Sequence, residues 1–150
     1  MSTNSHMGQP ASHHVLLEAV GVADTGDSRK DLEFFRTLPD CKVSPTGPTG
    51  FRVPKGKVLI ITDVDWQYGS GQAGGSQTFR VFIESLSEPD LQRRVFESTT
   101  HLDKSGNGGT SESMTTGFVV SRKVRLAVDT FPGGGKIQHV LLRGYLALDK

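Results

Sequence analysis

Hydrophobic and polar residues alternate along most of this chain in short runs. The segment KVRLAVDT, residues 123–130, places apolar side chains at every second position, as TFRVFIESL does over residues 78–86. This period of two is typical of a β-strand with one buried face. Together with more continuous apolar runs, it predicts strands over residues 14–22, 58–64, 78–86, 94–100, 113–121, 123–130 and 137–148.

Turn-forming segments separate these runs. Gly, Pro and small polar residues predict loops at 26–30, 39–50, 69–76, 103–111 and 131–135. Residues 31–38 allow a strand, an irregular segment or a short helix; we favour the first two because Pro39 follows at once. Roughly eight strands without a long helix predict an all-β fold, an antiparallel β-sandwich of jelly-roll type.

Two segments of the chain echo each other. Phe51-Arg-Val53 precedes a run from Lys57 to Asp63 that reads K-V-x-x-x-x-D, and residues 118–120 precede a similar run over 123–129. The echo predicts corresponding strand–turn–strand corners in two packed sheets, as in a double Greek key. Chance similarity between short motifs is the alternative.

The last strand resembles the closing strand of a known family. The segment HVLLRGYL, residues 139–146, is similar to that of tumour-necrosis-factor-like and complement-type jelly rolls, which often carry a Gly among aromatic residues. This resemblance is confined to the final strand. It implies a jelly-roll fold and assembly into trimers.

The same strand is apolar on both faces, at Val140, Leu141, Leu142, Tyr145, Leu146 and Leu148. One face can enter the core, but the other needs a cover, and a large exposed apolar patch is usually an interface. We therefore expect a homo-oligomer, with a closed trimer favoured over a dimer. Gly144 would let neighbouring backbones approach closely. The alternative is that residues 31–50 of the same chain cover this face.

Length and charge limit the functions that remain. The chain has 150 residues, which suffices for a single domain, predicted at residues 14–150 after a cloning-derived or flexible tail at 1–13. Its formal net charge of +1 favours neither nucleic acid nor an anionic membrane as a partner. Two short basic clusters, Arg93-Arg94 and residues 122–125, are interpreted as solvated strand faces. No apolar run is long enough for a membrane span.

Catalytic machinery is not recognisable in the sequence. Three of the five histidines lie in the N-terminal tail or beside it, and no G-x-S-x-G motif is present. We therefore predict no enzymatic activity, with a small hydrolase as the weakest of the hypotheses. No cofactor is expected apart from one calcium candidate.

The calcium candidate is the loop D-K-S-G-N-G that begins at Asp103. Asp103, Ser105 and Asn107, with Glu112 further on, supply the oxygen ligands that calcium prefers. The pattern departs from the calcium loop in having Ser at position three and its acidic residue at position ten. A plain hairpin loop turned by Asn-Gly is the competing interpretation.

The ligand candidate is a group of four residues, Asp63, Asp65, Trp66 and Tyr68. Two carboxylates spaced by two on a strand share a face, and acidic groups beside aromatic rings can hold a sugar. The competing interpretation is a solvated strand end with a packed Trp.

Two functional hypotheses follow. The first is a non-catalytic, self-assembling β-sandwich module of unknown biological role, with a secreted, periplasmic or cell-surface location favoured. The alternative is a carbohydrate-binding, lectin-like domain whose partner is a glycan bound at the four residues named above.

Overall fold

Strands dominate the computed structural model, which describes residues 11–23, 33–44 and 50–150. A single turn of 3-10 helix, Ala11–His13, precedes the first strand and is the sole helical element within these ranges. The strands are β1 (His14–Ala23), β2 (Phe35–Thr37), β3 (Lys57–Gly69), β4 (Ser76–Ser85), β5 (Gln92–His101), β6 (Gly108–Val120), β7 (Val124–Phe131) and β8 (Lys136–Leu148).

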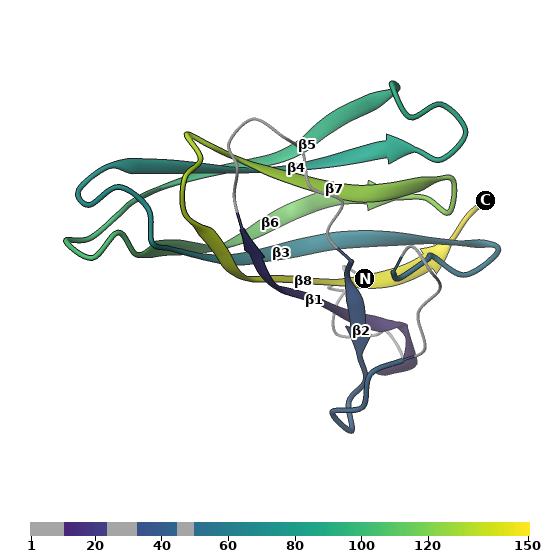
Figure 1. Ribbon diagram of the computed structural model, residues 1–150. Helices are drawn as coiled ribbons and strands as arrows, with labels where there is room; N and C mark the ends of the chain where they lie inside the picture. Colours follow the sequence, from purple (N-terminus) through teal and green to yellow (C-terminus); the bar gives the residue numbers. More distant parts are fainter. Residues whose placement is uncertain (1–10, 24–32, 45–49) are drawn as a thin grey trace.

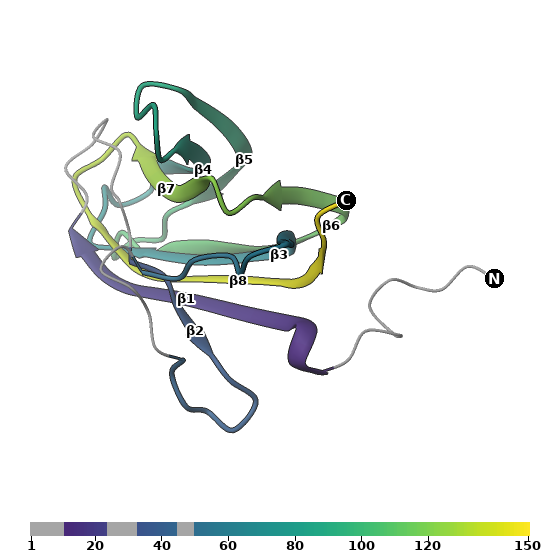
Figure 2. The ribbon, with the colours of Figure 1, turned by 90° about the vertical axis from the view of Figure 1, so that its right-hand side faces the viewer.

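The strands form two antiparallel sheets that pack face to face (Figures 1 and 2). The larger sheet has five strands in the order β2-β1-β8-β3-β6, and the smaller has three in the order β5-β4-β7. The predicted all-β fold, an antiparallel sandwich of jelly-roll type, is confirmed. The order also explains why β3 and β8 are so apolar, because they lie in the interior of the larger sheet.

The core lies between the sheets, around the only tryptophan of the chain. Trp66 of β3 is fully buried and stacks on Phe79 of β4, with ring centroids 5.1 Å apart. Its indole Nε1 donates a hydrogen bond of 2.8 Å to Oγ of Ser98 on β5, and Ser98 lies 2.6 Å from the hydroxyl of Thr110 on β6. These two hydrogen bonds therefore join three strands inside an otherwise apolar core.

Three loops meet at one end of the sandwich around Tyr68. The hydroxyl of Tyr68 accepts a 2.8 Å hydrogen bond from the backbone of Gly135 in the β7–β8 loop. The β3–β4 and β5–β6 loops touch through the backbone, where Gly71 N donates to Gly106 O over 3.0 Å. A Cβ atom at Gly106 would overlap the Gly71 carbonyl, and Gly106 has a φ of +76°. Glycine is therefore required for this close approach.

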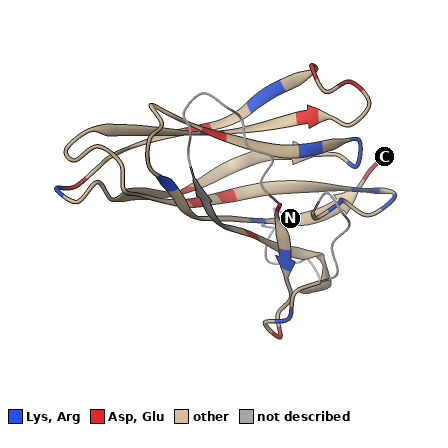
Figure 3. Cartoon of the chain, in the orientation of Figure 1, with Lys and Arg blue, Asp and Glu red and all other residues tan. Residues whose placement is uncertain are grey.

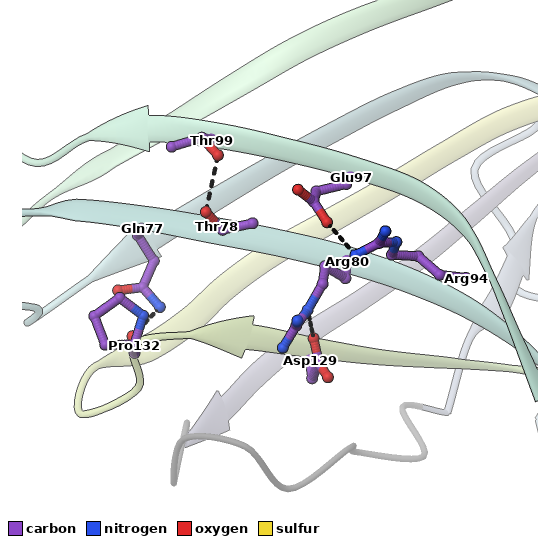
Figure 4. A network of polar contacts seen from close by, with 8 residues as sticks. All are labelled: Gln77, Thr78, Arg80, Arg94, Glu97, Thr99, Asp129 and Pro132. Atoms are coloured by element: carbon purple, nitrogen blue, oxygen red, sulfur yellow. Dashed lines mark hydrogen bonds and ion pairs between the residues drawn. The ribbon is translucent and has the colours of Figure 1, made fainter.

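The outer face of the smaller sheet carries paired polar side chains (Figure 4). Nε of Arg80 lies 2.6 Å from Oδ1 of the buried Asp129, its partner across β4 and β7. The hydroxyls of Thr78 and Thr99 are 2.8 Å apart across β4 and β5. Gln77, which is buried on the opposite, inner face of β4, donates to the carbonyl of Pro132.

The basic clusters have acidic neighbours. Arg94 forms an ion pair of 2.7 Å with Glu97, and Arg125 forms one of 2.7 Å with the buried Glu84. Figure 3 shows basic and acidic residues interspersed over both sheets. The interpretation of these clusters as ordinary strand faces agrees with this arrangement.

Most predicted strands are found, with differences at their ends. β3 continues to Gly69 instead of ending near Val64, and β6 begins at Gly108, inside the segment predicted as a loop. Residues 31–38 contribute the three-residue strand β2. The two K-V-x-x-x-x-D runs lie in different sheets, in β3 and β7. The predicted turn at 26–30 and most of the predicted tail lie outside the described residues.

Candidate functional site

The outer face of the five-stranded sheet can be followed row by row from the strand register. Residues directly opposite each other in neighbouring antiparallel strands point to the same face. Across β6, β3, β8 and β1, the successive rows are Val119–Ile60–Tyr145–His14, Ser113–Asp63–Arg143–Leu16 and Ser111–Asp65–Leu141–Glu18. A further row contains Gly109, Gln67 and His139. The face thus changes from apolar at one end to polar at the other.

The apolar end of this face forms what we call the apolar patch. Its members are side chains that remain partly exposed although they are aliphatic or aromatic: Leu16, Val58, Ile60, Val119, Leu141, Tyr145 and Ala147. Val119 keeps 52% of its surface exposed. In the described part of the chain, no strand packs over this face of the sheet. Single exposed apolar residues are ordinary, but a contiguous group calls for an explanation.

Charges of both signs border the apolar patch. Arg143 is directly opposite Asp63 on β3, and Glu18 on β1 lies diagonally from Arg143 across the β1–β8 pair. In the described ranges, no ion pair joins Arg143 to Glu18. The border therefore offers one cation, Arg143, and one anion, Glu18, to an approaching surface.

Asp63 is engaged by its own neighbourhood. Its Oδ1 accepts a 2.5 Å hydrogen bond from the Ser113 hydroxyl, and its Oδ2 accepts one of 2.7 Å from Thr62. The β3 strand bulges between Ile61 and Asp63, and β6 passes from Phe118 to Ser113 over the same interval. The Asp63 carboxylate holds β3 and β6 together at this irregular stretch. Its hydrogen bonds therefore indicate a structural role for Asp63.

The four residues of the predicted sugar site are not brought together. Asp63 and Asp65 do share the outer face, as their spacing predicted, but Trp66 and Tyr68 point into the core and are fully buried. Because β3 continues as a strand through all four positions, alternate side chains point to opposite faces. The aromatic rings are thus unavailable to stack on a sugar beside these carboxylates, which corrects that part of the prediction.

A shallow polar depression lies at the other end of the same face. It has a volume of about 400 Å³, and side chains line it from three strands and the β5–β6 loop. We call it the polar depression and define it by Asp65, Gln67, Asn107, Gly109, Ser111 and Gln138. Of these six residues, sequence analysis singled out only Asp65 and Asn107, and it assigned them to two different candidate sites. The register of β3 with β6 unites them.

The predicted calcium ligands lie along a hairpin instead of around one point. Oδ1 of Asp103 accepts hydrogen bonds from the backbone of Ser105, over 2.8 Å, and of Asn107, over 3.0 Å. Glu112 sits on β6 opposite the buried Val64, so its side chain points to the inner side of the sheet. Five residues of extended strand place it about 16 Å beyond Asn107. The loop closes as an Asp-capped turn, and the four residues do not converge.

The arrangement of histidine and serine bears on the hydrolase hypothesis. Oγ of Ser76 lies 3.2 Å from Nδ1 of His101 across β4 and β5. In the described part of the chain, no carboxylate is hydrogen-bonded to this histidine, and no group of three or more His, Cys, Asp or Glu residues could hold a metal ion. A Ser–His pair without an orienting carboxylate is a weak nucleophile–base arrangement.

Arg36 ties the edge strand β2 to the start of β1, a contact without a sequence signal. Its guanidinium donates to the backbone carbonyls of Ser12, over 3.0 Å, and His14, over 2.9 Å. Partial burial lowers the pKa of this guanidinium by desolvation. The group nevertheless stays charged at neutral pH.

Comparisons with known proteins bear on the fold. No protein-family model matches the chain, and no curated protein matches it by sequence. Among solved structures, it is similar to the structure of Eiger TNF from S. frugiperda, with a TM-score of 0.58 and 11% sequence identity over 92% of this chain and 94% of that one. The likeness shows that this chain shares the jelly-roll fold of that structure. No helix in the described ranges is long and apolar enough to cross a membrane.

Proposed function

We propose that this chain is a non-catalytic β-sandwich module that assembles with copies of itself through the apolar patch. The single observation that carries the proposal is the row Val119–Ile60–Tyr145, which runs across the outer face of three strands. A hydrophobic row of this kind on a solvent-facing sheet is unfavourable in an isolated chain. Covering it with a second copy removes that cost.

The charges at the border favour a second copy over a partner of another kind. A partner of one charge sign would be repelled by part of the border, since Arg143 and Glu18 lie on the same strand pair. A copy of the same face carries both signs and can oppose each charge with its complement. The formal net charge of +1 also opposes association only weakly.

A closed trimer is the assembly that we favour, with a dimer second. The final strand resembles that of tumour-necrosis-factor-like jelly rolls, which form trimers, and the overall fold is similar to that of Eiger TNF. Closed rotational symmetry would cover the patch in every copy without propagating into fibres. A secreted, periplasmic or cell-surface location remains part of this proposal.

The test is light scattering of matched variants after size-exclusion chromatography. Val119 and Phe131 are exposed to the same extent, 52% and 53%, but lie on the outer faces of different sheets. Val119→Glu is expected to lower the molar mass to that of a folded monomer, whereas Phe131→Glu should leave the mass unchanged. A wild-type protein that stays monomeric at high concentration would overturn the proposal, as would a Val119→Glu variant that keeps the wild-type mass.

A further inference from the structure

We propose that the polar depression binds a neutral, hydroxyl-rich ligand, such as one sugar ring of a glycan. This inference does not rest on the self-assembly proposed above. It also uses a different set of groups from the Asp–aromatic arrangement that the sequence predicted, because only Asp65 belongs to both.

The polar side chains of the depression lack protein partners. Within the described ranges, the side chains of Asp65, Gln67, Asn107, Ser111 and Gln138 take part in no hydrogen bond or ion pair. Nearby polar groups behave differently, since Asp63, Ser98, Thr110 and Asp103 are all engaged. Five unpaired polar groups around one hollow are therefore available to a ligand.

The chemistry of the lining selects the class of ligand. Three amides can donate and accept at the same time, the Ser111 hydroxyl can do both, and the Asp65 carboxylate accepts. Vicinal hydroxyls of a sugar present the matching set of donors and acceptors. The lining contains no Lys or Arg to attract an anion, and the two aromatic residues that border it, Trp66 and Tyr68, have buried side chains that offer no apolar surface.

Two glycines allow the close packing of the groups around the depression. Gly109 faces outward opposite Gln67, and a Cβ atom there would overlap the carbonyl oxygen of Trp66. Gly69 leaves room for the Gln138 amide, which a Cβ atom at Gly69 would overlap. The neighbouring loops are fixed by the contacts around Tyr68 described above. A site preformed in this way loses less entropy on binding.

The size and place of the depression agree with a glycan. Its volume of about 400 Å³ falls within the usual range for small-molecule sites. It starts at the row of Asp65, which also contains Leu141 of the apolar patch, and extends away from the row Val119–Ile60–Tyr145. A second copy over the apolar patch would therefore border the hollow at Asp65 and leave its far side, at Gln67 and Asn107, accessible.

The experiment uses the full chain, labelled with ¹⁵N and titrated with glucose, galactose, mannose, fucose and N-acetylglucosamine. We expect at least one of these sugars, at tens of millimolar, to shift the amide resonances of Gln67, Asn107, Ser111 and Gln138 together. The double variant Gln67→Ala/Gln138→Ala should bind that sugar at least about tenfold more weakly, because it loses two amides that hydrogen-bond the ligand. Asp65→Asn, which keeps the shape of the site, should also weaken binding.

Gln72→Ala is the matched control. This exposed amide lies at the same end of the sandwich, in the β3–β4 loop, but does not line the depression. Its binding should equal that of the wild type, and tryptophan fluorescence reports whether each variant is folded.

Three results would overturn the assignment. The first is that none of the five sugars shifts these resonances. The second is that calcium chloride alone shifts them and Asp65→Asn abolishes the effect, which would make the hollow a cation site. The third is that a folded Val119→Glu monomer no longer binds the sugar, which would place the site between copies. Retained binding by that monomer supports the proposal even where self-assembly fails.

Discussion

Gly144 of β8 lies so close to the backbone of Ile60 on β3 that a Cβ atom at Gly144 would overlap the Ile60 carbonyl oxygen. The two strands are neighbours in the middle of the larger sheet, and β3 bulges directly after this point, between Ile61 and Asp63. The close approach that the sequence suggested for Gly144 is thus a contact within the chain.

Gly144→Ala is therefore expected to destabilise the fold. The added methyl group meets backbone, which cannot rotate away, so either β3 or β8 has to shift. Overpacking of this kind lowers the free energy of unfolding by about 3 kcal/mol. Urea unfolding followed by the fluorescence of Trp66 measures the loss. Gly74→Ala would not serve as a control because Gly74 has a φ of +72°, so Ser87→Ala, at an exposed position, is the better comparison.

Much of the fold could be predicted from the period of the hydrophobic pattern. The strands β4 and β7 alternate, β8 is a longer apolar run, and the structure contains all three nearly where they were expected. The ends of strands were harder, since polar residues such as Asp63 and Asp65 look like the end of β3. They belong to it because the outer face of an antiparallel sheet can meet water.

The candidate sites were harder to predict for the same reason. Once β3 is known to continue to Gly69, its alternation places Asp65 and Gln67 on the outer face of the sheet. The same alternation places Trp66 and Tyr68 in the core. The polar depression needs the register of three strands, because Gln138 and Ser111 are far from Asp65 in sequence. No local pattern contains that information.

Ser98→Ala should destabilise the sandwich although it removes a single oxygen atom. The Ser98 hydroxyl accepts the hydrogen bond of the buried Trp66 indole, and without it that N–H has no partner in the core. Leaving a buried donor unsatisfied costs about 2 kcal/mol. Chemical denaturation should show this loss, while Ser87→Ala should lie within about 0.5 kcal/mol of the wild type. Equal stability of the two variants would contradict this role of Ser98.

The β5–β6 hairpin is expected to hold its shape without calcium. The Asp103 carboxylate already accepts two backbone N–H groups, and Glu112 points to the inner side of the sheet. EDTA should leave the melting temperature unchanged, whereas Asp103→Ala should lower stability by about 1–2 kcal/mol through the lost cap. If a chelator lowered the melting temperature by more than about 10 °C, a structural calcium ion would be bound by the folded state.

Two neighbouring leucines of β8 point in opposite directions. Leu142 is fully buried between the sheets, whereas Leu141 lies on the outer face in the apolar patch, opposite Asp65 and Glu18. The sequence offered both as members of one apolar strand and could not say which belonged to the core.

Glutamate at these two positions should have two different effects, unfolding in one case and loss of self-association in the other. Leu142→Glu places an unpaired charge in the core and should unfold the chain, since burying a charge alone exceeds the stability of a small domain. Leu141→Glu adds a carboxylate to a half-exposed position on the outer face and should leave the strand content seen by circular dichroism intact. If copies associate through the apolar patch, that variant also runs as a folded monomer, because each interface would then hold an extra buried charge. Unfolding by both variants would mean that Leu141 belongs to the core of a single chain, and an unchanged mass for a folded Leu141→Glu would remove this leucine from the interface.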